Sequence, residues 1–263
     1  MTQIVWLASY PRSGNTWMRF LLYNLHHCAP FASHQVDKFI PSFHKGLTSQ
    51  NFGESDRLIV KTHLRYHEEM PLAECTAGAI YVYRHPMAVM ASNVRYVMRR
   101  FRYEEMTAEA RCALVAMIVS EFVDNCGLLG WLDARYGRWD DNLHSWLGAT
   151  DKFPVLAIRY ENLARDPLAE IDRVCGFLGL KLSAAAQAAA VANASEQKLM
   201  EMEERELRHG WPGIFDNLIK GGSRNWRFVR DASLEPLAAL VAPDLLDRAA
   251  ATLGAAARQF GYD

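Results

Sequence analysis

The N-terminal residues of the chain predict a buried strand, a tight turn and a helix in immediate succession. Residues 4–8 form a short apolar run, Pro11 and Gly14 mark the turn, and Thr16 opens a helical pattern. Such a junction gathers backbone N–H groups at a helix N-terminus, which suits a bound phosphate or a similar anion. The segment therefore predicts a site for a phosphate-like ligand directly after the first strand.

This turn lacks the signature of the magnesium-dependent NTPases, G-x-x-x-x-G-K-[ST]. No glycine precedes Gly14 at the required distance, and no lysine follows it. The pattern therefore disfavours a nucleoside triphosphate with magnesium as the ligand.

Further apolar runs, rich in β-branched or aromatic residues, are typical of strands buried on both faces of a parallel sheet. The predicted strands cover residues 4–8, 58–62, 79–83 and 155–159. Helical patterns alternate with them, at residues 16–28, 86–98, 108–132 and 168–178. The alternation predicts one α/β domain over the whole chain, with a central doubly wound parallel sheet and helices on both faces.

The C-terminal part is predicted to be helical apart from one loop. Residues 184–194 and 249–257 are rich in alanine, and a terminal helix is expected from about 243 to 260. Residues 205–231, rich in glycine, tryptophan and arginine, predict the loop.

Charge and cysteine content exclude several classes of protein. A net charge of −1 gives no general attraction to nucleic acid or to an anionic membrane, so an anion site needs local positive charge. Five widely spaced cysteines without a C-x-x-C pair favour reduced thiols. The longest apolar run, residues 113–119, is too short to span a bilayer. We expect a cytoplasmic protein without a membrane span or a nucleic-acid partner.

Four segments resemble, in order, the motifs of the PAPS-dependent sulfotransferases, in a bacterial-like form of the cytosolic-type domain. Residues 9–17 (Ser-Tyr-Pro-Arg-Ser-Gly-Asn-Thr-Trp) resemble the family's 5'-phosphosulfate loop, and residues 60–64 resemble the segment with its catalytic base. Residues 83–92 carry an arginine and a serine eight positions apart, like its 3'-phosphate motif. Residues 155–163, followed by Asp-Pro, resemble a fourth strand–helix junction.

The resemblance implies transfer of a sulfuryl group from 3'-phosphoadenosine 5'-phosphosulfate (PAPS) to a hydroxyl or amine of a small-molecule or carbohydrate acceptor. The product nucleotide is 3'-phosphoadenosine 5'-phosphate (PAP), and no metal is required. The residues implied in nucleotide binding are Arg12, Ser13, Gly14, Asn15, Thr16, Trp17, Arg84, Ser92, Tyr160, Lys220, Gly221 and Gly222. Those implied in catalysis are His63, Arg12 and Lys61.

The placement of three polar residues agrees with this chemistry. Arg12, His63 and Arg84 each follow a predicted strand, at the sheet edge where α/β proteins bind ligands. Sulfuryl transfer removes a proton from the acceptor and builds charge on the oxygen that leaves with the nucleotide. His63 suits the role of base near neutral pH, and Arg12 and Lys61 suit stabilisation of that charge.

Simpler interpretations exist for several of these residues. Arg84 is also compatible with a solvated arginine and Ser92 with an ordinary helix residue. For Trp17, core packing and the adenine contact seen in the family are equally compatible with the pattern, and packing is likewise an alternative for Tyr160.

Two segments depart from the family pattern. The usual Arg-Lys-Gly-x-x-Gly-Asp-Trp reads Ile219-Lys-Gly-Gly-Ser-Arg-Asn-Trp226 here. The first arginine of the family motif, which binds the 3'-phosphate, is therefore replaced by isoleucine, and Arg224 is a candidate substitute. The usual Ser-Phe pair reads Ser195-Glu196, so the adenine-facing aromatic residue is lost or realigned.

Other functions compatible with the sequence are a P-loop-like nucleotide-dependent kinase or phosphotransferase and a non-catalytic nucleotide-binding protein. The basic run 95–103 favours a solvated helix end, then a mouth for an acidic acceptor, and only then RNA binding. Residues 29–57, 95–107 and 205–218 are expected to line the acceptor side. The identity of the acceptor stays open, and a homodimer is possible.

Overall fold

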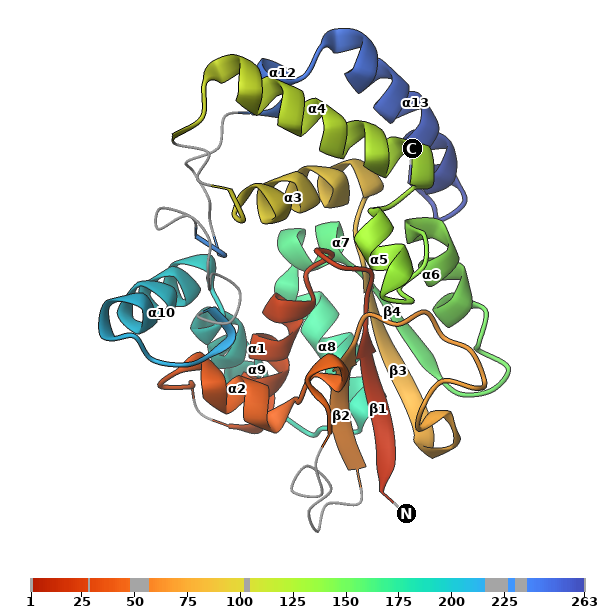
Figure 1. The fold of residues 1–263 in the computed structure, drawn as a ribbon. Helices are drawn as coiled ribbons and strands as arrows, with labels where there is room; N and C mark the ends of the chain where they lie inside the picture. Colours follow the sequence, from red (N-terminus) through yellow and green to blue (C-terminus); the bar gives the residue numbers. More distant parts are fainter. Residues whose placement is uncertain are drawn as a thin grey trace.

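The four strands pair into one parallel sheet with the order β2–β1–β3–β4 (Figure 1). Its strands are β1 (Gln3–Ala8), β2 (Arg57–Thr62), β3 (Thr76–Tyr83) and β4 (Val155–Arg159). The computed structural model describes residues 2–27, 29–47, 57–101, 105–215, 227–229 and 236–262. The predicted α/β class and all four predicted strands are confirmed.

The register brings the ends of the two neighbouring strands β1 and β2 to the same level. Ala8 pairs with Thr62, so the residues that follow them, Ser9 and His63, leave the sheet side by side. All four strands run parallel, and their carboxyl ends therefore meet at one edge.

Helices cover both faces of the sheet, as predicted. The alternation of β1 shows why: Ile4, Trp6 and Ala8 belong to one apolar core, whereas Val5 and Leu7 belong to the other. On the first face lie α3 (Pro86–Met98), α4 (Ala108–Asn125), α6 (Trp139–Leu147) and α13 (Pro243–Arg258). On the second lie α1 (Asn15–His26), α8 (Pro167–Leu178), α9 (Ala184–Asn193) and α10 (Glu196–His209).

Shorter elements connect these layers. They are α2 (Ser33–Phe39), η1 (Phe43–Lys45), η3 (Ala73–Cys75), α5 (Leu129–Asp133), α7 (Tyr160–Arg165) and α12 (Leu237–Leu240). Within the described ranges, no helix is both long and apolar enough to cross a bilayer.

Two predicted boundaries were wrong. The helix expected over 108–132 is split into α4 and α5, because Cys126 adopts a left-handed conformation (φ 48°) that ends α4. The loop expected from 205 begins only after His209, where Gly210 (φ 62°) ends α10. Both breaks depend on the conformation of one residue, which a hydrophobic pattern does not indicate.

Candidate active site

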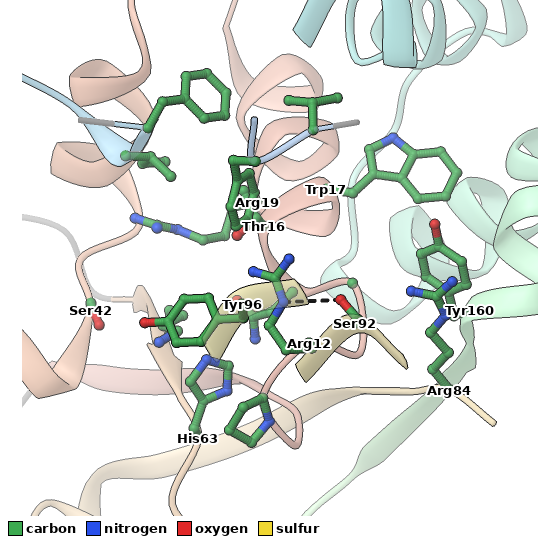
Figure 2. A pocket seen from close by; sticks show the side chains of 18 of the residues that line it. Arg12, Thr16, Trp17, Arg19, Ser42, His63, Arg84, Ser92, Tyr96 and Tyr160 are labelled. Carbon is green, nitrogen blue, oxygen red and sulfur yellow. Dashed lines mark hydrogen bonds between the residues drawn. The ribbon is translucent and has the colours of Figure 1, made fainter. Parts of the chain in front are cut away.

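The carboxyl ends of the strands open into a cavity of about 750 Å³. It brings together residues from segments far apart in the chain (Figure 2). The sequence-predicted residues that line it are Arg12, Gly14, Asn15, Thr16, Trp17, Lys61, His63, Arg84, Ser92 and Tyr160. Ser13 is buried in the turn, and its hydroxyl has no hydrogen-bond partner in the described part of the chain. Lys220, Gly221 and Gly222 lie outside the described residues, so their role stays a prediction.

Two residues in the left-handed region shape the turn after β1. The φ angle is 74° at Arg12 and 103° at Gly14, and a Cβ atom on Gly14 would lie 2.5 Å from the Tyr160 ring. Because α1 begins at this turn without a side-chain cap, the N–H groups of its first turn remain for a ligand. Asn15 secures the turn by donating its amide N–H to the Leu7 carbonyl at 3.1 Å.

The side of the cavity next to β3 and β4 combines a cation with aromatic rings. The Arg84 guanidinium lies 4.2 Å from the centroid of the Tyr160 ring, and the Trp17 ring meets Tyr160 edge-on at 5.8 Å. Trp17 also donates its indole N–H to the Ala194 carbonyl at 2.9 Å. Trp17 and Tyr160 therefore both pack against neighbouring residues and line the cavity.

Arg12 lies between the side of the cavity next to β3 and β4 and the opposite side, where His63 follows β2 (Figure 2). Its Nε donates to the Ser92 hydroxyl at 3.1 Å, and its guanidinium lies 4.7 Å from the Phe228 ring and 5.2 Å from the Tyr96 ring. Burial lowers the pKa of Arg12 to about 10, so this side chain is cationic at neutral pH. The sequence did not predict the contact between Ser92 and Arg12.

Glu203 of α10 fixes the short segment 227–229 at the cavity wall. Its buried carboxylate accepts the backbone N–H groups of Phe228 at 2.5 Å and Val229 at 3.0 Å, which places the Phe228 ring against Arg12. Sequence analysis missed Glu203, because a glutamate in a helix rich in charged residues is usually solvated. Its place among the buried positions of α10 was the available signal.

Hydrogen bonds fix both the position and the tautomer of His63. Its Nδ1 lies 2.7 Å from the Ser9 carbonyl oxygen, which only accepts, so Nδ1 carries the proton. Its backbone N–H donates to Nε2 of His44 at 2.8 Å, and its carbonyl accepts from the Asn142 amide at 2.9 Å. The ring points into the cavity (Figure 2), and Nε2 makes no hydrogen bond within the described ranges. This nitrogen therefore keeps its lone pair for a ligand.

The electrostatics of this corner keep both imidazoles neutral. Burial, Lys61 and His44 hold the pKa of His63 well below its usual value of 6.5. Burial and Lys61 lower the pKa of His44 to about 3. Burial and the neighbouring Arg19 and Lys45 likewise depress the pKa of Lys61. His63 is thus able to accept a proton at neutral pH.

Three side chains on one face of α6 hold the main chain at the strand ends. Trp139, Asn142 and Trp146 donate to the carbonyl oxygens of Arg84, His63 and Leu64, at 3.2, 2.9 and 2.8 Å. Their spacing of three and four residues places them on the same side of the helix. This spacing is visible in the sequence, but nothing there indicates that the three side chains bind backbone carbonyls.

Asn142 is the central member of this group. It is fully buried, donates also to the Tyr136 carbonyl at 2.6 Å, and accepts the Tyr81 hydroxyl at 2.6 Å. Every polar atom of this amide is therefore used, which gives the His63 backbone a single position.

The basic run that begins at residue 95 is solvated only in part: Arg100 and Phe101 are exposed, as the first interpretation of the sequence predicted, but the residues before them are not. Arg95 and Tyr96 line the cavity, and Arg99 is buried with its guanidinium 4.2 Å from the Tyr96 ring.

Across the described part of the chain, no group of three or more His, Cys, Asp or Glu side chains is arranged to hold a metal ion.

The comparisons with known proteins identify the family. The sulfotransferase domain family matches residues 2–229, so the chain belongs to this family, and the predicted class of enzyme is confirmed. A flavonol sulfotransferase-like protein from Flaveria bidentis is 22% identical over 254 residues, covering 85% of this chain and 75% of the relative. Cytosolic sulfotransferase 8 from Arabidopsis thaliana is 26% identical over 194 residues, covering 65% of this chain and 53% of the relative. Both relatives are plant proteins and do not support a bacterial-like form.

A solved structure supports the same fold. Retinol dehydratase in complex with androsterone and the inactive cofactor PAP aligns with a TM-score of 0.65 at 15% identity. The alignment covers 99% of this chain and 82% of that chain.

We predict that Asn142→Asp lowers kcat by roughly tenfold or more and leaves PAP affinity nearly unchanged. The carboxylate loses both donated hydrogen bonds and repels the His63 carbonyl, so the base is displaced whereas the turn is not. Asn24→Asp is the matched control, because Asn24 is a buried amide that donates to the Ala190 carbonyl between α1 and α9. Steady-state kinetics and thermal unfolding of both variants separate the two effects. Equal stability losses with normal kcat and an unchanged pH–rate profile for Asn142→Asp would contradict this role.

Proposed function

We propose that this sulfotransferase transfers the sulfuryl group of PAPS to a hydroxyl or amine of a small-molecule or carbohydrate acceptor. The single observation that carries the proposal concerns a neutral His63 beside the N-terminus of α1 and the Arg12 cation: among the described residues, nothing binds Nε2 of His63 and no side chain caps that helix. A proton acceptor next to an anion site is what an in-line displacement at sulfur needs.

The order of the strands supports one orientation for the two substrates. The 5'-phosphosulfate lies at the turn after β1, and the nucleotide extends over β3 and β4, where Trp17, Arg84 and Tyr160 line the cavity. The acceptor lies on the β2 side, because His63 follows β2. Lys220 with Gly221 and Gly222 contributes to the 3'-phosphate site.

Catalysis uses groups that the fold holds in place. The oxygen or nitrogen of the acceptor attacks sulfur, and Nε2 of His63 removes the proton from that atom. Negative charge grows on the oxygen that bridges sulfur and the departing PAP, and Arg12, Lys61, Thr16 and the N–H groups of the turn stabilise it. These groups suffice to stabilise that charge without a metal ion.

The alternative of a kinase-like phosphotransferase is less well supported. The turn has arginine at position 12 and no lysine directly after Gly14, and Glu196 is the one carboxylate among the described lining residues.

We further propose a cytoplasmic location and a possible homodimer.

Replacement of the base tests the mechanism. His63→Ala is expected to lower kcat by about 10²–10⁴-fold and to change PAP affinity little, because the base acts on the acceptor. His67→Ala, at an exposed position four residues further on, is the control. Single-turnover rates with PAPS and PAP titrations give both quantities. Near-normal turnover in His63→Ala would show that another group removes the proton.

The 3'-phosphate pocket is tested by comparing PAP with AMP. Arg84→Ala and Lys220→Ala are each expected to weaken PAP roughly tenfold or more and to leave AMP affinity almost unchanged. Arg100→Ala, at an exposed site just after α3, serves as the control. Equal losses for both nucleotides would assign these residues to the fold or to the 5' end. A native protein without preference for PAP over AMP would exclude PAPS as the donor.

A further inference from the structure

The β2 side of the cavity carries a cluster of positive charge in addition to Arg12 and Arg84. The cluster consists of Arg19 from α1, Lys45 from η1 and Lys61 from β2, which all line the cavity. Figure 2 shows Ser42 and His63 on one side of Arg12, and Trp17 and Tyr160 on the other. The cluster therefore lies next to the base, on the side assigned to the acceptor.

Among the described residues, only two of these three side chains pair with a carboxylate, and it is the same one. Asp37 accepts from Arg19 at 2.7 Å and from Lys45 at 2.5 Å. The Lys61 ammonium makes no hydrogen bond or ion pair with any described residue. A structural ion pair between α1 and α2 needs one cation for Asp37, whereas this corner holds three. Charge balance is therefore left to a ligand.

Arg19 gives a second, independent indication. Its side chain is only 6% exposed, and a single nitrogen donates to both Asp37 and the Ile40 carbonyl. Its Nε is buried and has no hydrogen-bond partner in the part of the chain that the structure describes. Nε is closed off from the cavity, whereas the other terminal nitrogen, Nη1, donates to no described residue and is not closed off, so Nη1 is the donor that an anion in the cavity can reach.

The neighbouring wall keeps this cluster close to the catalytic base. Residues 41–45 run along the end of β2, where Ser42 pairs with Lys61 and the Lys61 N–H donates to the Pro41 carbonyl at 2.9 Å. His44, in the same segment, accepts the backbone N–H of His63. Lys45, Lys61 and the base thus belong to one hydrogen-bonded corner of the cavity.

We propose that the acceptor is itself an organic anion: a hydroxylated or aminated molecule with a carboxylate, sulfate or phosphate group bound by Arg19, Lys45 and Lys61. The inference rests on the proposed sulfuryl transfer, in which His63 faces the acceptor. Lys61 also contacts the transferred group, so Arg19 and Lys45 are the residues that test the anion site. Binding of an oxyanion restores the charge balance of the corner and stabilises the protonated form of Lys61.

The test uses the complex of the whole chain with PAP, titrated with 4-hydroxybenzoate and with 4-hydroxybenzamide. The two phenols have nearly the same size and differ in charge. We expect the carboxylate to bind roughly tenfold or more tightly than the amide, and this ratio to approach one in Arg19→Leu and in Lys45→Leu. Lys38→Leu is the matched control, because Lys38 is exposed on α2 and does not line the cavity.

Each outcome decides between the hypotheses. Lys45→Leu keeps the test valid if loss of the buried Arg19 prevents folding, since the Lys45 side chain is 46% exposed. Equal affinities for the two phenols, no binding of the carboxylate, or a preference that survives in Lys45→Leu would overturn the anion site. Failure of PAP itself to bind would instead overturn the proposed function.

Discussion

The whole site depends on the parallel pairing of β1 with β2, which ends both strands at the same level. Because Ala8 pairs with Thr62, the Ser9 carbonyl lies beside His63 and accepts its Nδ1–H at 2.7 Å. This single hydrogen bond selects the tautomer and leaves Nε2 directed at the cavity. A shift of one residue in the register would separate these two groups and remove the base.

Positive charge around His63 has a cost that a ligand relieves. Burial opposes protonation of the ring most strongly, and Lys61 and Arg12 add to it, so the folded chain keeps His63 neutral where the unfolded chain binds a proton. The contribution of His63 to the free energy of unfolding is therefore complete above pH about 6.5 and decreases as the pH falls below it. Anionic substrates reverse this effect, because their charge favours protonation of the same groups. The site is thus electrostatically incomplete until anions occupy it.

Local patterns in the sequence predicted the strands, the turn and ten of the residues that line the cavity, because each is encoded within a few neighbouring positions. Gly14 and the residues after each strand are examples. Contacts between distant segments were not predictable in this way. The bonds of Asn142 to His63 and of Glu203 to Phe228 join residues 79 and 25 positions apart, and their partners are backbone groups without a side-chain signature. The charge cluster of Arg19 likewise exists only once α1, η1 and β2 are assembled.

The central claim, that the fold holds a neutral His63 with its proton on Nδ1, is tested most directly by nitrogen-15 NMR of the imidazole ring. We predict an Nδ1–H tautomer whose Nε2 stays unprotonated through pH 6.5 in the free chain, with a pKa that rises when PAP binds. His63→Ala identifies the signal by its disappearance. A ring that carries its proton on Nε2, or that titrates at or above 6.5 in the free chain, would contradict the account.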